Sequence, residues 1–236
     1  MNATVQQLVS LALLAATVSL LGWASNSAGP PQQHSFAQQL EAVRTGQADE
    51  ILVLTAQVGD EQLAQLAGLK LRRLELQHAH VTAGGLKHLA AVEGLEQLVL
   101  RDESLDDGGM AMLAQCTGLE VLNLPDANFS DQGLAELREL PELQLLRFHS
   151  ARVTDAGMRE IAALKHLRFL HLIGVPITDA GLIPLESMAH LESFYVDDAN
   201  VSDDGVERLL TALPDLHIHI NQEHSDRDPH RHTHHH

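Results

Sequence analysis

The stretch LRFLHLIGVPITDAGLIPLESMAH, residues 167–190, decides the fold because its pattern recurs along the chain. The leucines that begin each copy are 24 residues apart, at Leu71, Leu95, Leu119, Leu143, Leu167 and Leu191. An earlier copy, one residue shorter, begins at Ala48. Seven copies in register indicate a repeat architecture, in which each unit packs only against its neighbours.

The spacing of apolar residues changes within each copy from that of a strand to that of a helix. Leu170 and Leu172 alternate with other residues, as in a half-buried strand. Leu182, Leu185 and Met188 are three apart, which fits one face of a helix. A single strand and helix cannot bury their apolar sides alone. Stacking therefore predicts an α/β solenoid, with the strands in one parallel sheet and the helices in an outer layer.

The joint between strand and helix has a recurring sequence, of which Ile177-Thr178-Asp179-Ala180-Gly181 is typical. The Thr is a good helix N-cap, the Asp favours the first turn, and the Gly allows close approach of a neighbouring backbone. The alternative is a calcium ladder made by Asp60, Asp107, Asp131, Asp155, Asp179 and Asp203. One carboxylate per unit is a poor cage for an ion that takes six to eight oxygens, so we favour capping.

Over residues 48–220 the pattern LxxLxLxxAx(V/I)TDxGLxxLxxL resembles the leucine-rich-repeat family, close to its cysteine-containing and bacterial "TDAGL" subtypes. The resemblance implies a right-handed, curved solenoid whose concave sheet face carries the ligand. The chain departs from the family at the ninth position of the unit, where Asn, Cys or Thr is usual. That position is occupied by Ala79, Ala127, Ala151, Val175 and Ala199, so the usual side-chain ladder is absent there.

The segments on either side of the repeats have distinct compositions. Residues 1–28 contain the uncharged run Leu8–Ala24, which predicts either a cleaved signal peptide or a membrane anchor, and both place the rest outside the cytoplasm. We expect residues 29–47 to form a linker and a capping helix with Ser35 as N-cap. LHIHI, residues 216–220, predicts a last strand, and residues 221–236 a disordered histidine-rich tail.

Charge and motifs exclude several classes of function. The formal net charge of −17 argues against nucleic acid and against docking on anionic lipid, which leaves the N-terminal segment as the only expected membrane contact. No nucleophile-elbow, Walker or zinc-protease motif occurs, and the single cysteine, Cys116, occupies a core position of its repeat. We therefore expect binding rather than catalysis, with no cofactor.

The strand residues between the core leucines are expected on the concave side. In the later repeats they form an aromatic, aliphatic and cationic cluster in a chain with only 3% aromatic residues. Aromatic residues and Arg are common anchors of protein interfaces, so we predict a protein or peptide partner there. Scattered strand-favouring surface residues are the alternative. The predicted contacts are Leu145, Arg147, His149, Phe169, His171, Ile173, Tyr195 and Asp197.

The C-terminal sequence NQEHSDRDPHRHTHHH suggests a second, different activity. Neutral imidazoles bind Zn²⁺, Ni²⁺ and Cu²⁺ well. The alternative function is therefore metal binding by the tail, through His230, His232, His234, His235 and His236. A solvated tail without a metal remains the simpler interpretation.

Overall fold

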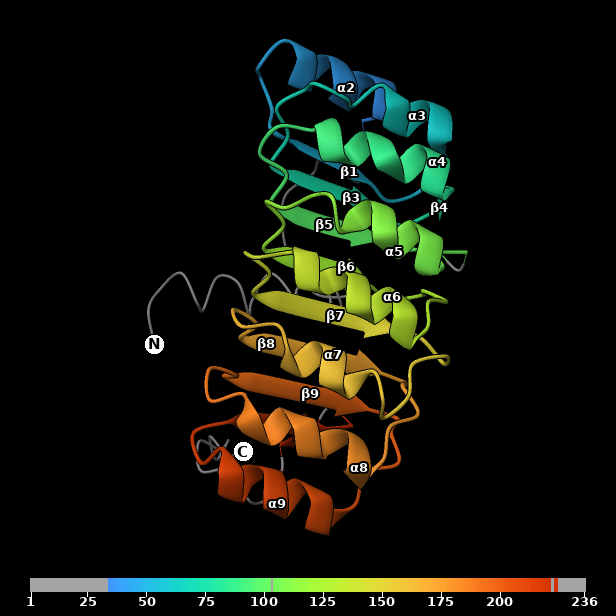
Figure 1. Ribbon diagram of the computed structural model, residues 1–236. Coiled ribbons are helices and arrows are strands. Elements are labelled where there is room, and N and C mark those ends of the chain that lie inside the picture. Colours follow the sequence, from blue (N-terminus) through green and yellow to red (C-terminus); the bar gives the residue numbers. More distant parts are fainter. Residues whose placement is uncertain (1–33, 103, 222, 225–236) are drawn as a thin grey trace, which may run out of the picture. The chain divides into compact units, whose positions relative to one another are not determined.

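The computed structural model describes residues 34–102, 104–221 and 223–224. The predicted N-terminal leader and the histidines of the tail from residue 230 lie outside these ranges. The described chain forms one nine-stranded sheet in which the strands follow one another in chain order, and helices cover one side of it (Figure 1). The neighbouring strands are parallel apart from the last pair, β10 and β11, which is antiparallel. The fold is thus the predicted α/β solenoid.

Each of the seven repeats contributes one strand to the large sheet, and β10 and β11 follow the last repeat. The large sheet contains β1 Glu50–Val53, β3 Arg73–Leu76, β5 Gln97–Leu100, β6 Val121–Leu124, β7 Leu145–His149, β8 Phe169–Ile173, β9 Ser193–Asp197, β10 His217–Ile220 and β11 Glu223–His224. A two-stranded sheet pairs β2 Val58–Gly59 with β4 Ala79–His80.

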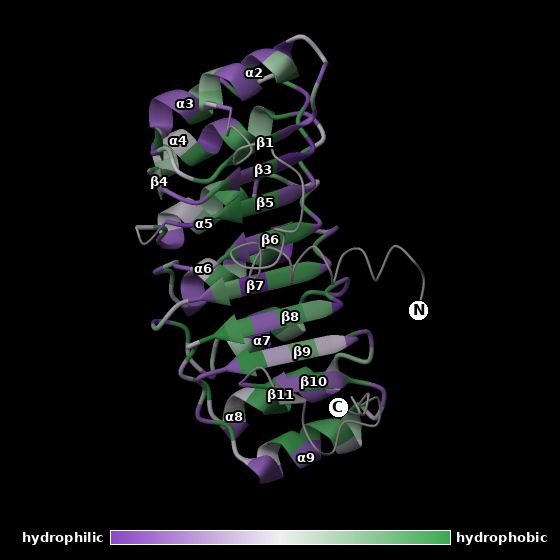
Figure 2. Cartoon of the chain, turned by 180° about the vertical axis from the view of Figure 1, so that it is seen from behind, coloured by the Kyte–Doolittle hydropathy of each residue, from purple (hydrophilic) through white to green (hydrophobic). Residues whose placement is uncertain are grey.

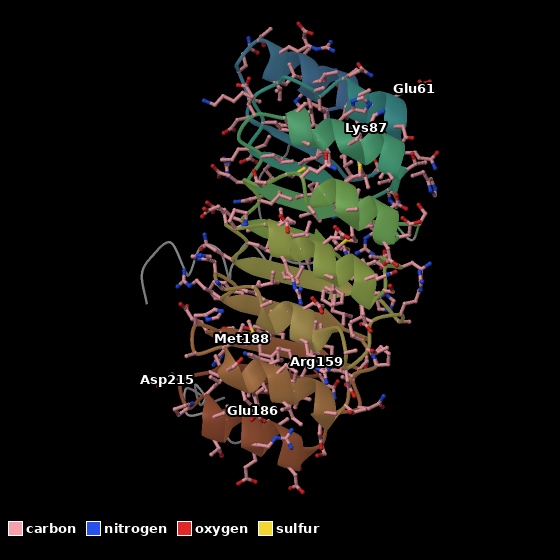
Figure 3. All side chains as sticks on the ribbon, in the orientation of Figure 1. Glu61, Lys87, Arg159, Glu186, Met188 and Asp215 are labelled. Atoms are coloured by element: carbon pink, nitrogen blue, oxygen red, sulfur yellow. The ribbon has the colours of Figure 1, made fainter. Side chains whose placement is uncertain are left out.

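The helices are short, often one α-helical turn followed by a 3₁₀ turn. They are α2 Phe36–Arg44, α3 Asp60–Ala64, α4 Ala83–Leu86, η1 Lys87–Ala91, α5 Asp107–Leu113, α6 Asp131–Glu136, η2 Leu137–Glu139, α7 Met158–Ala162, α8 Asp179–Leu182, η3 Ile183–Ser187 and α9 Asp203–Ala212. Charged side chains such as Lys87, Arg159 and Glu186 lie on this helical layer (Figure 3). Among the described residues, no helix has the length and apolarity needed to cross a membrane.

The core lies between the two layers and follows the predicted periodicities. Leu170 and Leu172 of β8, Leu182 and Leu185 of the following helices, and Met188 directly after η3 are all fully buried. Each such side chain contributes about 1.5–3 kcal/mol relative to exposure. Because the same positions are filled in each repeat, the core is continuous along the stack.

The aspartates of the repeat joints bind the next repeat. Asp131 accepts a hydrogen bond from the backbone N–H of Thr154 at 2.8 Å, and its other oxygen accepts from the Thr154 hydroxyl at 2.7 Å. Each carboxylate therefore binds the Thr or Ser that precedes the helix of the following unit; this residue is the helix N-cap in every pair except that of Thr154, which lies three residues before the N-cap Gly157. The pairs are Asp60–Thr82, Asp107–Ser130, Asp131–Thr154, Asp155–Thr178 and Asp179–Ser202. We call this set the aspartate ladder.

The ladder has one gap, and both of its partners change there together. The second repeat has Ala83 where the others have Asp, and the third has Asp106 where the first has Gly59 and the rest have Thr or Ser. Asp106 caps its own helix by accepting a hydrogen bond from the Gly109 N–H at 3.0 Å. The second repeat lacks the carboxylate, and the third repeat therefore begins its helix with Asp106, a cap that does not depend on a carboxylate from the preceding repeat.

The recurring glycine is explained by the same carboxylates. A Cβ on Gly181 would lie 2.5 Å from Oδ1 of Asp155, and one on Gly133 would lie 2.8 Å from Oδ1 of Asp107. Real Cβ atoms do not approach other atoms so closely. The glycine thus leaves room for the carboxylate of the preceding repeat, which is a close approach between units as the sequence suggested.

The first strand has a side-chain cap on its open edge. Ser35 begins α2 with a capping box, in which Gln38 bonds back to the Ser35 N–H at 2.8 Å. One turn further, Gln39 donates to the Leu52 carbonyl at 2.8 Å and accepts from the Leu52 N–H at 2.7 Å. The amide of Gln39 therefore replaces a neighbouring strand beside β1, which limits edge-to-edge pairing.

Candidate binding surface on the sheet

The sheet has one side against the helices and one side away from them. Residues of β7–β10 that alternate with the core positions lie on the outer side, which is seen in Figure 2. We call this set the sheet face. Its members are Leu145, Arg147, His149, Phe169, His171, Ile173, Ser193, Tyr195, Asp197, His217 and His219. It includes all eight contacts predicted from the sequence.

A chain of hydrogen bonds crosses four strands of this surface. The strand register places Asn123, Arg147, His171 and Tyr195 side by side. Arg147 donates from Nη1 to Asn123 Oδ1 and from Nε to His171 Nδ1, both at 3.2 Å. His171 Nε2 lies 2.9 Å from Asp197 Oδ2.

These bonds fix the state of the His171 ring. Arg147 can only donate, so Nδ1 of His171 must accept and the proton must be on Nε2, which donates to Asp197. Burial lowers the pKa of His171; the hydrogen bond to Asp197 opposes this, and the charge of Arg147 lowers the pKa further. His171 is therefore neutral at pH 7, and Arg147 and Asp197 are held in place around it.

Two histidines that were not among the predicted contacts extend the surface. The rings of Tyr195 and His219 are stacked, with centroids 4.2 Å apart and planes 8° from parallel. His219 in turn lies edge-on to His217, with the two Nε2 atoms 2.8 Å apart. The alternation in LHIHI predicts the strand, and the same alternation places His217 and His219 on its outer side.

The apolar members differ in exposure. Leu145 and Phe169 are only 5% and 6% exposed, although they lie outside the continuous core. The guanidinium of Arg168 lies 5.4 Å from the centre of the Phe169 ring, a cation–π contact. Arg147, His149, His171, Ile173 and Tyr195 are half-buried. A partner would therefore touch these five more readily than the two apolar side chains beside them.

The sequence matches no protein-family model and no curated protein, but it resembles solved structures. Internalin C2 from Listeria monocytogenes superposes with a TM-score of 0.56 and 21% identity, over 78% of this chain and 73% of that one. A leucine-rich-repeat protein from Leptospira interrogans gives a TM-score of 0.51 and 18% identity, over 76% of this chain and 50% of that one. The chain has a leucine-rich-repeat fold.

Within this leucine-rich-repeat sheet, the charge on the later strands differs from that of the chain. The sheet face has one Arg, one Asp and four His, so its formal charge is near zero while that of the whole chain is −17. An acidic or neutral partner would therefore meet less repulsion here than an average part of the surface would offer.

The earlier repeats have a separate hollow, which the sequence did not predict. A cavity of about 610 Å³ lies where the first strands lead into their helices. Arg101 crosses this region, donating to Gln77 at 3.1 Å and to Asp126 at 2.5 Å. The lining is largely polar, with Thr55, Gln57, Gln77, His78, Ala79, His80, Arg101, Asp102 and Asp126.

Two other candidate groups have different outcomes. Cys116 is buried, and burial raises the pKa of its thiol to about 11, so it has little thiolate at neutral pH. The five tail histidines proposed as metal ligands lie outside the described residues. Among the side chains that the structure describes, no group of three or more His, Cys, Asp or Glu is arranged to hold a metal ion.

Proposed function

We propose that the chain is an interaction module that binds a protein or peptide on the sheet face. The observation that carries the proposal is the fixed row of Asn123, Arg147, His171 and Asp197 beside aromatic and aliphatic residues. Side chains already held in one arrangement lose little entropy when a partner binds, which favours affinity.

Arg147 is the group best placed for recognition. Its Nε and Nη1 are used within the sheet face, while Nη2 makes no hydrogen bond to the residues that the structure describes. A guanidinium with one free edge suits a carboxylate or a peptide carbonyl. The nearby Tyr195 and Ile173 would supply apolar contact, and Tyr and Arg are typical of interface hot spots.

The proposed place of action is outside the cytoplasm. The support is the uncharged run of residues 8–24, which has the composition of a signal-peptide core or a membrane anchor. We further propose a concave sheet face of the bacterial "TDAGL" kind, because the repeat pattern resembles that subtype. Binding is proposed in place of catalysis because Arg147, His171 and Asp197 of the sheet face are hydrogen-bonded to one another.

The test compares partner capture by three forms of the full chain. The first is unchanged, the second carries R147A and Y195A, and the third carries I183A as a control. Ile183 is 52% exposed on η3, in the helical layer. Partners from an extracytoplasmic extract should be retained by the first and third forms and lost by the second. Equal capture by all three would count against the sheet face.

The alternative proposal is metal binding by the tail. It is supported by five histidines within residues 230–236, a density that binds Zn²⁺, Ni²⁺ and Cu²⁺. Growth under zinc or copper stress should fall when residues 225–236 are deleted. Normal growth of the deleted strain would remove this alternative and leave the sheet-face proposal unaffected.

A further inference from the structure

Arg147 is a half-buried cation whose hydrogen-bond partners are both neutral. Its Nη1 donates to the Asn123 amide oxygen and its Nε donates to the His171 ring. Among the described residues, no carboxylate forms an ion pair with it. Burial lowers the pKa of Arg147, and Asp197 and Asp126 oppose this only through longer-range attraction. A partly desolvated charge is costly unless an opposite charge lies against it.

The other half-buried arginines of the described chain all have a carboxylate partner. The pairs are Arg72 with Asp49 and Glu50, Arg73 with Glu75, and Arg168 with Glu192. An exposed arginine such as Arg159 needs no such partner, because water solvates its charge. Arg147 differs from both groups, since it is partly removed from water and the described chain supplies no opposite charge against it.

Arg147 lies near the middle of a row of outer residues that crosses the sheet from β5 to β10. In strand order the row is Val99, Asn123, Arg147, His171, Tyr195 and His219. A chain terminus bound to Arg147 would leave half of this row uncovered. A segment that runs past Arg147 could contact both halves, so an acidic side chain within a segment fits the surface better than a terminal carboxylate.

The accessible apolar residue nearest to this arginine in the register is Ile173. It lies one strand away and two residues further along, because Arg147 pairs with His171 and His149 pairs with Ile173. From the strand spacing and the rise per residue, the Cα atoms of Arg147 and Ile173 are about 8 Å apart. Alternate residues of an extended peptide are about 7 Å apart and lie on one side. Two such residues of a partner would therefore meet Arg147 and Ile173 together.

We propose that the partner of the sheet face is an extended peptide segment with an Asp or Glu whose carboxylate binds Arg147 and an apolar residue two positions away that packs on Ile173. The carboxylate accepts from Nη2, so the bonds of Arg147 to Asn123 and His171 are kept. The near-zero formal charge of the sheet face allows an acidic segment to approach. This inference rests on the proposed function and names the chemistry of its partner.

The test selects linear peptides from a phage-displayed random library on three forms of the full chain: unchanged, R147M and R159M. Arg159 lies on the helical layer (Figure 3), so R159M removes the same charge from another surface. The unchanged and R159M forms should enrich peptides with an Asp or Glu two positions from an apolar residue. R147M should lose the preference for Asp and Glu.

A selected peptide is then synthesised with Glu or with Gln at its acidic position, and both affinities are measured by calorimetry. The Gln peptide should bind the unchanged chain at least about tenfold more weakly, because its partner Arg147 is left without a countercharge. The two peptides should bind R147M equally. R147K, which keeps the charge, should retain a preference for the Glu peptide, and this comparison does not require R147M to fold.

The possible failures are distinguishable. Selected peptides that lose binding with Y195A but have no acidic preference would overturn the carboxylate and leave the sheet face as the binding surface. An acidic preference that R147M retains would also overturn the proposal, because the carboxylate would then bind elsewhere. Failure of the unchanged chain to enrich any peptide would overturn the inference together with peptide binding by the sheet face.

Discussion

The gap in the aspartate ladder can be filled by two substitutions, and the structure predicts that together they increase the stability of the fold. Ala83 and Asp106 are the two positions where a carboxylate in one repeat and a Thr or Ser cap in the next are both missing. The substitutions A83D and D106T together should create the pair of hydrogen bonds seen between Asp131 and Thr154. A83D alone would place a new carboxylate beside Asp106, and like charges repel.

The magnitude follows from the existing pairs. Asp131 makes two bonds to Thr154, at 2.8 and 2.7 Å. Hydrogen bonds to charged groups contribute about 1.5–3 kcal/mol each, which we reduce to about 1 kcal/mol because these groups are partly exposed. The double variant should therefore be about 2 kcal/mol more stable, a rise in Tm of about 4–8 °C for a domain of this size. A83D alone should be less stable by about 1 kcal/mol.

The assay is urea unfolding of the unchanged chain, the two single variants and the double variant. D106T alone should be within about 0.5 kcal/mol of the unchanged chain, because Thr also caps a helix. The reasoning is refuted if the A83D single variant is as stable as the A83D/D106T double variant. It is also refuted if the double variant is no more stable than the unchanged chain.

Three more predictions concern the same contacts and the sheet face. Hydrogen bonds from the Thr or Ser of the next repeat lower the pKa of ladder carboxylates. The stabilisation by these carboxylates is therefore complete above the unfolded pKa of about 3.9, and it is lost as the pH falls through the lower folded pKa values. The urea concentration at the unfolding midpoint should decrease when the pH is lowered below about 4, and a constant midpoint down to about pH 3 would contradict this. The carboxylates with this shift are Asp60, Asp107, where the bonds outweigh burial, and Asp179. G181A should destabilise the chain by about 1–3 kcal/mol, because the new Cβ would overlap with Asp155. The same substitution should cost less in a D155A background. If G181A costs the same free energy of unfolding with and without D155A, the contact between the two residues is excluded. The NMR pKa of His171 should be below 6.5 and fall further in D197N, because the bond to Asp197 raises it; a rise in D197N would show that the bond is absent.

The architecture could be predicted because every repeat has the same pattern of apolar residues, and equal units of this kind bury their apolar sides by stacking. Residues such as Leu170 and Leu182 show the strand and helix periods, and a 24-residue interval aligns each with its copy. The aspartate ladder could not be predicted as easily. Whether Asp155 bonds its own helix or Thr178 depends on the distance between repeats, which the sequence does not state. The joint change at Ala83 and Asp106 was the signal that such a pair exists.

The sheet face shows a similar division. Strand alternation places Arg147 and His171 on the outer side, but their hydrogen bond depends on rotamers and on a register that only packing defines. The ninth position of the repeat lacks the usual polar side chain, but residues at the eighth position of two repeats form hydrogen bonds to the backbone of the preceding repeat. Asp102 accepts from the Val81 N–H at 2.9 Å, and Ser150 donates to the Phe129 carbonyl at 2.6 Å. Both side chains are buried and vary between repeats, so no repeated letter marks them.

The most direct test of the proposed function is crosslinking from single positions in living cells of the source organism. A photoreactive phenylalanine is placed at Ile173 on the sheet face in one form and at Ile183 on the helical layer in another. The account predicts a defined crosslinked partner from position 173 and none from position 183. Crosslinks from position 183 alone would contradict the sheet face as the binding surface.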